Sequence, residues 1–416
     1  MTNGPEATTP STHLVRRLNA ERVLQEVWDG APVTASDLMA ATGLARSTVL
    51  ALCRELTDRG WLVELDDARA AGAYTKGRPA LRYAFRPDAA LVVGVDAGQH
   101  RVSAAVADLH GRVLAEEVVQ VDPASDADAR RATVRDAVDA AVARSGRDGG
   151  AVAAAVLGVP APVATGGVPA GERNPFWALM NPGLGDLFAL RGWDVVVEND
   201  ANLAAVAEAE HGDGAAAYAA LLVGERIGAG IVLDGALRRG PRGAIGEMRV
   251  LDLVAGVGSS DGLGALARDE ARRLLDSGEA SGDDSDDGVG AAGSALADVP
   301  RDLLDAEHVL AAAAAGDALA QQVVDGLADR LARICAVLSG LLDLDRVIVT
   351  GAMAPALGPM VDRARGLLPD HLHAPAVEVV VSDLGPDVVR SGALRLAVEH
   401  VRARALDQDL PARVSV

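Results

Sequence analysis

The segment 195–202 constrains the fold of this chain more than any other, because a short hydrophobic run ends there on polar side chains. Residues 195–197 are valines and read as a strand, and Asn199 and Asp200 follow shortly after it. Open α/β sheets bind their ligands at the carboxyl ends of the strands. We therefore predict a ligand site that contains Asn199 and Asp200. The alternative is that the pair only caps a helix beginning at Ala201.

Further strand patterns upstream predict an α/β domain around this segment. A hydrophobic run over 91–96 ends in an Asp-x-Gly sequence, and two more strands are expected at 101–108 and 112–119. A strand hairpin that opens with Asp-x-Gly is typical of the actin-like ATPase fold, in which the first turn wraps phosphate. A glycine-rich turn is predicted at 224–230.

The N-terminal part of the chain predicts a module of another kind. Apolar residues recur at helical spacing over 14–28, and Thr34 with Asp37 matches a capping box at the start of a second helix. Gly43 ends that helix, and a third helix is expected over 45–59. Two helices joined by a tight glycine turn form the helix-turn-helix layout.

A predicted hairpin after these helices completes a winged helix-turn-helix DNA-binding domain over 14–86. Its strands are expected at 61–65 and 81–85, with a basic loop between them that weighs against an ordinary helical hairpin. A recognition helix meets base edges at its N-terminal end, and a narrow basic wing fits a minor groove. The residues expected to contact DNA are Arg46, Ser47, Thr48, Lys76 and Arg78.

The charge distribution separates this module from the rest of the chain. The formal net charge is −20, yet residues 1–90 carry 11 basic and 11 acidic residues, so the acidic excess lies beyond them. A neutral head on an acidic body fits a DNA-binding module joined to a domain that does not bind DNA. With no signal-peptide pattern or long apolar run, and with Cys53 and Cys335 as expected buried thiols, we predict a cytoplasmic protein without membrane association.

Six short motifs spread over the body of the chain point to one family. They are Gly94-Val95-Asp96-x-Gly98, Asp108-Leu109-x-Gly111, Gly158-Val159-Pro160-x-Pro162, Glu198-Asn199-Asp200-Ala201-Asn202, Gly228-x-Gly230 and Gly243-x-x-Gly246-Glu247. Together with the winged helix they resemble the ROK family of sugar kinases and sugar-responsive repressors. The likeness is greatest to its transcriptional-regulator branch, such as the xylose and N-acetylglucosamine repressors.

The resemblance implies a sugar-kinase-like domain with the actin-like ATPase fold and two lobes. We expect the first lobe to comprise 87–204 with 386–416, and the second to comprise 205–385. Residues 277–295 are rich in Gly, Ser, Asp and Ala and are predicted to form a disordered insertion.

The resemblance also assigns roles to residues of this domain. Asn174, Asn199, Asp200 and Glu247 are expected to bind sugar hydroxyls, and the residue matching Asp200 is the general base in the family's kinases. The chemistry agrees, because amides and carboxylates form paired hydrogen bonds with a polyol. A carboxylate can also remove a hydroxyl proton during phosphoryl transfer.

The chain departs from the family at the zinc site and at the phosphate-binding turns. Family members carry a His and a Cys-rich zinc site after the residue matching Glu247, whereas residues 248–262 contain neither Cys nor His, so we predict no metal. Glu225 stands in the second phosphate turn, where a carboxylate repels ATP, and residues 97–100 lack the Gly-Thr character of the first. We therefore expect no cofactor and no catalysis, with Asp200 as a vestigial base.

The sequence thus predicts a sequence-specific DNA-binding transcriptional regulator, in its simplest form a repressor, with a degenerate kinase domain that binds a sugar or sugar derivative. Its other partners would be a double-stranded DNA operator and further copies of the chain, as a homodimer or homotetramer, because recognition helices read half-sites in symmetric pairs. Two alternatives stay open. One is an active sugar kinase with an appended DNA-binding domain, and the other is a ligand-independent DNA-binding oligomer.

Overall fold

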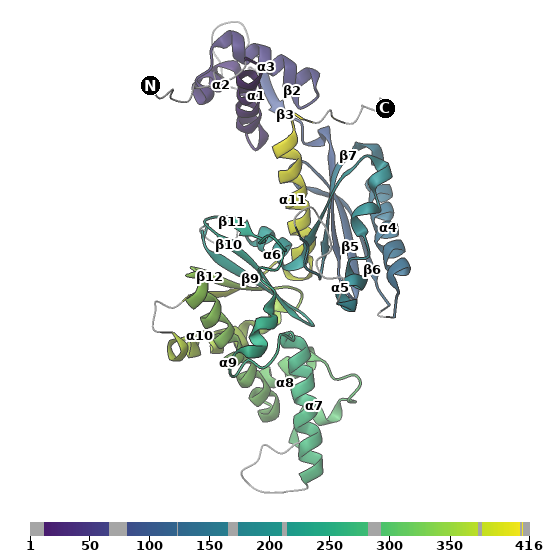
Figure 1. Ribbon diagram of the computed structural model, residues 1–416, viewed down its shortest axis with the longest axis vertical. Helices are drawn as coiled ribbons and strands as arrows, with labels where there is room; N and C mark the ends of the chain where they lie inside the picture. The colour runs from purple at the N-terminus through teal and green to yellow at the C-terminus, as the bar shows by residue number, and fades with distance from the viewer. Residues whose placement is uncertain are drawn as a thin grey trace, which may run out of the picture.

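The computed structural model describes residues 12–65, 81–122, 124–164, 174–209, 214–281, 293–372, 377–407 and 410. They form three bodies that follow one another along the long axis: a small N-terminal domain, a first α/β lobe and a second α/β lobe (Figure 1). Within these ranges, no helix combines the length and the apolar character needed to cross a membrane.

The N-terminal domain packs three helices against a small antiparallel sheet of order β1-β3-β2. Its elements are α1 (Thr12–Trp28), β1 (Val33–Thr34), α2 (Ala35–Thr42), α3 (Arg46–Asp58), β2 (Leu62–Leu65) and β3 (Arg82–Phe85). Thr34 and Asp37 form the predicted capping box, and Gly43 ends α2 with a φ of 72°. The helix-turn-helix and its hairpin are thereby confirmed. The loop between β2 and β3, residues 66–80, lies outside the described residues.

The first lobe is built on a five-stranded sheet of order β6-β5-β4-β7-β8, in which β4, β7 and β8 are parallel. Its strands are β4 (Leu91–Ala97), β5 (Arg101–Asp108), β6 (Val113–Gln120), β7 (Val152–Val159) and β8 (Asp194–Asn199). Its helices are α4 (Ala127–Arg144), α5 (Pro175–Met180), α6 (Asp200–Glu208) and α11 (Val388–Arg404). Helix α4 covers one face of the sheet and α11 the other.

The second lobe repeats this topology with a sheet of order β11-β10-β9-β12-β13. Its strands are β9 (Tyr218–Val223), β10 (Ile227–Leu233), β11 (Ala236–Arg238), β12 (Arg346–Thr350) and β13 (Glu378–Val381). Its helices are α7 (Leu263–Ser281), α8 (Ala306–Ala314), α9 (Ala318–Leu342) and α10 (Gly358–His371). The repeated order, a hairpin beside parallel strands in each lobe, is the predicted actin-like arrangement of two lobes.

Two expectations from the sequence need correction or completion. The predicted glycine-rich turn at 224–230 is mostly strand, because β10 begins at Ile227. Gly230 is needed there for close packing and not for a turn, since a Cβ at this position would overlap the carbonyl oxygen of Ala201 in α6. Helix α7 runs to Ser281, into the expected insertion at 277–295, and residues 282–292 of that segment lie outside the described residues.

Candidate functional site

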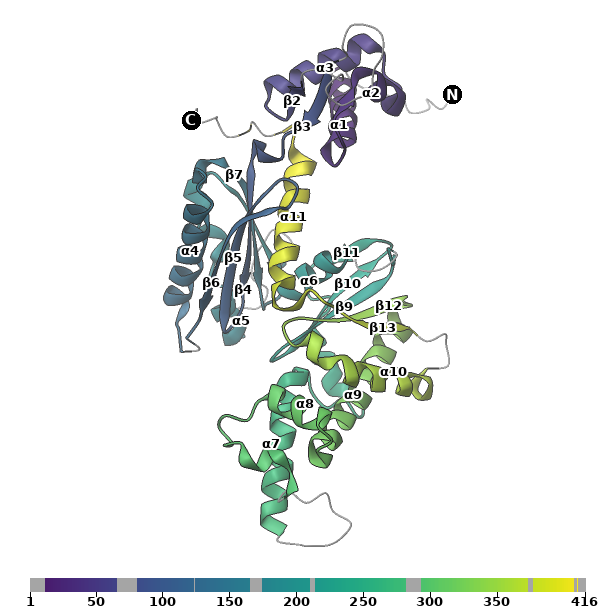
Figure 2. The same ribbon diagram turned by 180° about the vertical axis from the view of Figure 1, so that it is seen from behind.

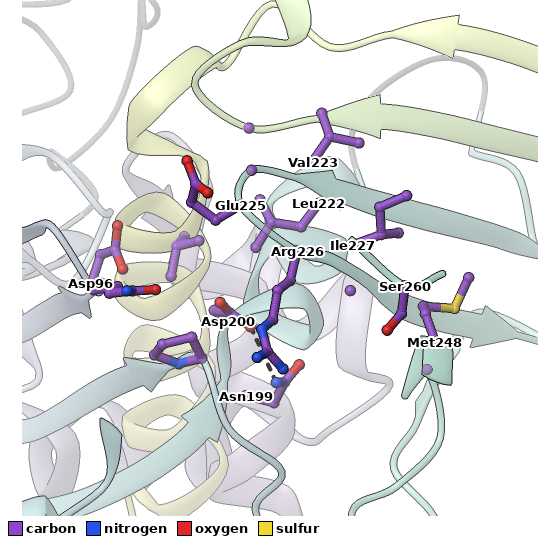
Figure 3. Close-up of a pocket in the computed structure, with 18 of the residues that line it drawn as sticks. Asp96, Asn199, Asp200, Leu222, Val223, Glu225, Arg226, Ile227, Met248 and Ser260 are labelled. Atoms are coloured by element: carbon purple, nitrogen blue, oxygen red, sulfur yellow. Dashed lines mark hydrogen bonds between the residues drawn. The ribbon is translucent and has the colours of Figure 1, made fainter. Parts of the chain in front are cut away.

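A cavity of about 380 Å³ lies between the two lobes. It is bounded by the ends of β4 and β8 from the first lobe, and by the turn between β9 and β10 from the second (Figure 3). The start of α11 closes it behind. The carboxyl ends of the parallel strands thus meet at one cleft, as the sequence predicted for Asn199 and Asp200.

Asn199 and Asp200 line the cavity and are held by a network of hydrogen bonds. The Asn199 side chain accepts from the backbone N of Asn202 at 3.1 Å and donates to the carbonyl O of Ala161 at 3.3 Å. It also donates to Asp200 Oδ1 at 3.1 Å, and this oxygen accepts from the backbone N of Ala201 at 2.8 Å. Asn199 therefore caps α6 while facing the cavity, so the helix-cap role is compatible with the predicted ligand site.

Three of the carboxyl groups that line this cavity have a raised pKa. Burial raises the pKa of Asp200 to about 7, with the charges of Asp96 and Glu247 adding to the effect. Burial also raises the pKa of Asp96 to about 7, although three arginines oppose it, and raises that of Glu247 against the charge of Arg226. Near neutral pH Asp96 and Asp200 are therefore partly protonated, so each can donate as well as accept hydrogen bonds.

Asn174 also reaches the cavity, at the start of α5. Its side-chain oxygen accepts from the backbone N of Phe176 at 3.0 Å and of Trp177 at 3.4 Å, so the residue caps this short helix. The structure therefore brings together all four residues predicted for the sugar site, namely Asn174, Asn199, Asp200 and Glu247.

Arg226 is a cavity residue that was not predicted from the sequence. Its guanidinium lies 4.7 Å from the ring centre of Phe176, so it joins the second lobe to the first across the cleft. Figure 3 shows its side chain directed toward Asn199 and Asp200. Successive side chains of a turn point in different directions, so one of two neighbouring charged residues can face the cavity. The adjacent opposite charges of Glu225 and Arg226 were therefore the sequence signal that could have identified Arg226.

Charged and bulky side chains line the side of the cleft where the family resemblance places the phosphate-binding turns. Glu225 forms an ion pair with Arg268 at 3.4 Å, so part of its negative charge is neutralised. Gln99 and His100 line the cavity at the first turn. The main chain of that turn is held by the buried Arg130, which donates to the carbonyl O of Gly98 at 3.0 Å and also to that of Ala97.

The zinc site that the resemblance implies does not fit the residues present. The loop 254–262 follows Glu247 and contains no thiol or imidazole, and zinc in structural sites needs four such ligands. Among the residues that the structure describes, no cluster of three or more His, Cys, Asp or Glu side chains could hold a metal ion.

The predicted DNA-contacting residues lie at the N-terminal end of α3. Arg46 and Ser47 are exposed and Thr48 is half-buried, whereas Val49 and Leu52 belong to the core. Ala45 precedes the helix without a side-chain cap, which leaves backbone N–H groups of the first turn open to an external acceptor. Lys76 and Arg78, predicted for the wing, lie outside the described residues.

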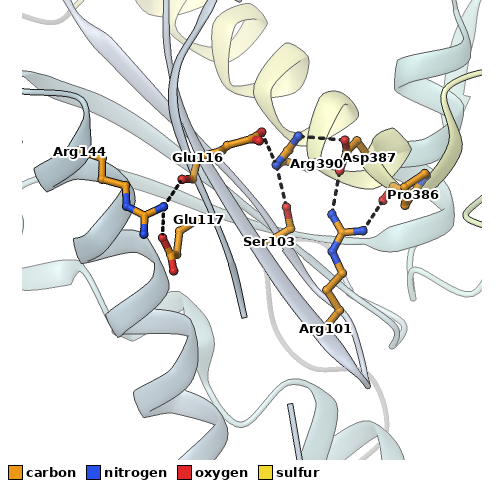
Figure 4. Close-up of polar contacts among 8 residues, drawn as sticks. All are labelled: Arg101, Ser103, Glu116, Glu117, Arg144, Pro386, Asp387 and Arg390. Atoms are coloured by element: carbon orange, nitrogen blue, oxygen red, sulfur yellow. Dashed lines mark hydrogen bonds and ion pairs between the residues drawn. The ribbon is translucent and has the colours of Figure 1, made fainter. Parts of the chain in front are cut away.

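Helix α11 connects the cleft to the N-terminal domain (Figures 1 and 2). At the cleft, Val388 and Val389 line the cavity. The buried Arg390 pairs with Asp387 at 3.1 Å and Glu116 at 2.9 Å, and donates to Ser103 at 3.0 Å (Figure 4). These bonds fix the start of the helix to the first-lobe sheet.

The other end of α11 contacts the DNA-binding module. Arg402 pairs with Asp29 at 2.7 Å and lies over the ring of Trp28, 5.3 Å from its centre. Just beyond the helix, the carbonyl O of Leu406 accepts from Arg59 at 2.9 Å, and Asp407 forms an ion pair with α1. One hydrophobic core also runs continuously from the three N-terminal helices to α11.

Comparison with known proteins agrees with this architecture. Residues 92–253 match the ROK family, and residues 29–66 match the IclR helix-turn-helix domain. The bifunctional enzyme NanE/NanK of Brucella melitensis is 30% identical over 215 residues, covering 51% of this chain and 37% of the enzyme. The chain thus spans little more than a third of that relative.

Two other proteins are matched over more of their own length. The xylose repressor of Caldicellulosiruptor bescii is 24% identical over 274 residues, which are 63% of this chain and 66% of the repressor. The crystal structure of a ROK family transcriptional regulator, a homologue of the E. coli MLC protein, superposes with a TM-score of 0.72 at 21% identity, covering 92% of this chain and 96% of the other. The chain therefore carries a region similar to the ROK family over residues 92–253, preceded by a helix-turn-helix domain of the IclR type over residues 29–66.

Proposed function

We propose that this protein is a DNA-binding transcriptional repressor that responds to a sugar or sugar derivative. The observation that carries the proposal is α11, which lines the ligand cavity at one end and contacts the helix-turn-helix at the other. A ligand that prefers one arrangement of the lobes can thereby bias the position of the DNA-binding module. The resemblance to a xylose repressor supports a sugar as the effector.

The proposed ligand is a polyol held by Asn174, Asn199, Asp200 and Glu247. Each of these side chains lines one cavity, and Asn199 and Asp200 are fixed by bonds to the protein before any ligand arrives. The partly protonated carboxyl of Asp200 and the fixed amides suit hydroxyl groups, which both donate and accept. Preorganisation of this kind lowers the entropic cost of binding.

The proposed DNA contacts come from the exposed end of α3 and from the wing. Arg46, Ser47 and Thr48 would read base edges, and Lys76 and Arg78 would contact the minor groove. Two copies of the chain would present two such modules to a palindromic operator in the cytoplasm. We assign 14–86 to this domain, 87–204 with 386–416 to the first lobe, and 205–385 to the second.

We further propose that the domain does not transfer phosphate. Asp200, with a pKa of about 7, would serve well as a general base, so the proposal does not rest on this residue. It rests on the turns that would have to bind the phosphates of ATP. Glu225, Gln99 and His100 occupy the turns where a kinase needs small residues and backbone N–H groups to hold phosphates. Even paired with Arg268, a carboxylate at this turn opposes the approach of ATP.

An active sugar kinase remains the second candidate, and the raised pKa of Asp200 is the observation that favours it. NanE/NanK, a relative over half of this chain, is named as an enzyme. ATP turnover with hexoses and amino sugars separates the two candidates.

Selection of bound sequences from random DNA duplexes tests the DNA-binding part of the proposal. The native chain should enrich a palindromic site. Arg46→Ala should lower affinity for that site by roughly tenfold or more and relax the base preference, whereas Arg78→Ala should mainly reduce the dependence of affinity on salt. Arg273→Ala, an exposed arginine of α7 in the second lobe, is the matched control. If no site is enriched, or if Arg46→Ala and Arg273→Ala behave alike, the N-terminal end of α3 is not the surface that contacts DNA bases.

A further inference from the structure

The loop 254–262 forms part of the second-lobe wall of the cleft. Ser260 lines the cavity, and its carbonyl O accepts from the backbone N of Ile227 at 3.1 Å. The backbone N of Gly262 donates to the carbonyl O of Glu225 at 2.9 Å. The loop is therefore bonded on both sides of the turn that carries Glu225 and Arg226, and its position determines where those two side chains lie.

Nothing in the composition of this loop explains its order. Apart from Val257, which is buried, and Val254, which packs half-buried against the core, its residues are small, exposed or polar, and Gly256 and Gly258 adopt positive φ values of 81° and 84°. A segment of this kind loses much conformational entropy when it is fixed. The family resemblance implies a zinc ion here, yet the loop offers no thiol or imidazole to hold one.

A single guanidinium lies at the centre of the loop. Arg330 projects from α9, is 7% exposed, and donates to the carbonyl oxygens of Val257 and Ser259. It also donates to the carbonyl O of Asp261 at 3.3 Å. These three acceptors come from alternate residues of the loop and converge on one side chain. The planar guanidinium provides several N–H groups in a fixed fork, which an ammonium group does not.

The next arginine of the same helix supports the start of the loop. Gly256 lies against Arg333, whose Nε would be 2.8 Å from a Cβ at the glycine position. Arg333 is itself held by an ion pair with Asp329 at 2.7 Å, and Asp329 also bonds His371 at 3.1 Å. Helix α9 thus presents two arginines to the loop, one inside it and one beneath it.

We propose that Arg330 is a positioning residue that closes the loop 254–262 in place of a metal ion and so fixes the second-lobe wall of the ligand cleft. The closure of the loop stands on its own contacts, and the effect on ligand binding rests on the function proposed above. Removal of the guanidinium leaves three carbonyl groups to find other donors, which favours opening of the loop. An open loop releases Ser260 and the Glu225–Arg226 turn from their present positions.

Amide hydrogen exchange on the full-length protein tests the closure directly. Arg330→Met should raise exchange within 254–262 and at Ile227 by about tenfold or more, while the first lobe keeps native protection. Arg330→Lys should fall between Met and the native residue, because lysine can reach some of the carbonyls. Leu327→Ala is the control on the same helix, since this core side chain should lower protection throughout the lobe without singling out the loop.

Two further arms exclude a metal and separate this inference from the proposed function. Neither EDTA nor added zinc should change exchange within 254–262 of the native protein. Arg330→Met should weaken the thermal shift given by a bound sugar, yet leave affinity for operator DNA without sugar unchanged. Should Arg330→Met fail to fold, exchange in the Lys variant and in the native protein with EDTA or zinc still tests the closure.

The inference is overturned if Arg330→Met leaves exchange in the loop at its native rate, if it loosens the whole lobe as Leu327→Ala does, or if EDTA alone opens the loop. A native protein whose stability responds to no sugar would contradict the proposed function, and it would leave the exchange result on Arg330 intact.

Discussion

The two walls of the cleft differ in how their polar groups are used. On the first-lobe wall, Asn199 and Asp200 are fixed by bonds to the main chain and to each other, and they still face the cavity. On the second-lobe wall, Glu225 and Arg226 are committed to Arg268 and to Phe176 respectively. Under the proposed function, the first wall holds the hydroxyl groups of the ligand, and the second places charged side chains where a nucleotide would need small ones.

The difference teaches that polar groups of one cleft can be tied to the fold in different ways. The polar pair on β8 also caps α6, so its geometry is held by the fold as well as by any ligand. The side chains of the β9–β10 turn instead contact other side chains, Glu225 with Arg268 and Arg226 with Phe176.

The largest effect expected from a single substitution on these walls concerns ligand binding. Asp200→Ala should weaken the sugar that gives the largest thermal shift by about 100-fold, because the ligand loses charge-assisted hydrogen bonds in a desolvated site. Glu225→Gln on the opposite wall should change that affinity by less than about twofold. Isothermal titration of both variants measures the contrast. Equal losses of sugar affinity in the two variants would show that the first-lobe wall is not the main sugar-binding wall.

The acidic cluster predicts a stability that falls as pH rises. Asp96 and Asp200 have pKa values of about 7 in the folded protein, against an ordinary value of 3.8, so the folded state binds more protons between these limits. Their contribution to stability is therefore greatest near pH 4 and is lost progressively as the pH rises through 7. Thermal unfolding between pH 5 and 8 measures it.

Asp200→Asn provides the control for the pH prediction, because an amide at this position cannot titrate. The slope of the unfolding temperature between pH 5 and 8 should be flatter in this variant than in the native protein. If the two slopes coincide, the carboxyl groups of the cleft do not carry the pH dependence.

A smaller effect is expected for nucleotides at the second-lobe wall. Glu225→Thr removes a negative charge and restores a hydroxyl, and it should raise affinity for a non-hydrolysable ATP analogue by about tenfold. Fluorescence titration of a labelled nucleotide against both proteins gives the comparison. An unchanged affinity would mean that Gln99 and His100 at the first turn, and not Glu225, exclude the nucleotide.

The smallest effect concerns the contact between the walls. Arg226→Met removes a cation–π contact at a partly open site and should lower the free energy of unfolding by about 0.5–1 kcal/mol. Phe176→Leu should cost a similar amount, and the double variant should cost less than the sum if the two side chains interact. Additive losses in this cycle would show that Arg226 does not hold the lobes together.

Much of the fold could be predicted from the sequence because its signals are local. The capping box of Thr34 and Asp37, the helix end at Gly43 and the strand before Asn199 depend on neighbours in the chain. The path of α11 could not be predicted, since its role arises from contacts such as Arg402 with Asp29, which are far apart in sequence. The role of Arg330 could not be predicted for the same reason, because its partners are backbone carbonyls of a distant loop.

The residues expected to bind sugar, and Glu225 at the opposite wall, could be predicted from the sequence, but Arg226 could not. The four residues expected to bind sugar all line the cavity, although only Asn199 and Asp200 stand at the end of a strand. Arg226 lies in a segment whose glycines suggest a turn, yet the turn ends at Ile227 and the glycines beyond it serve strand packing against α6. Short glycine motifs do not distinguish a phosphate turn from a close-packed strand.

The most direct test of a sugar-binding domain without catalysis is ATP turnover in the presence of a sugar that the protein demonstrably binds. Full-length protein is titrated with sugars by thermal shift, and the compound with the largest shift is then incubated with ATP and Mg²⁺ while ADP release is followed. We predict a clear shift together with ADP release no greater than that of Asp200→Asn. Turnover that the native protein sustains and Asp200→Asn abolishes would contradict the loss of catalysis.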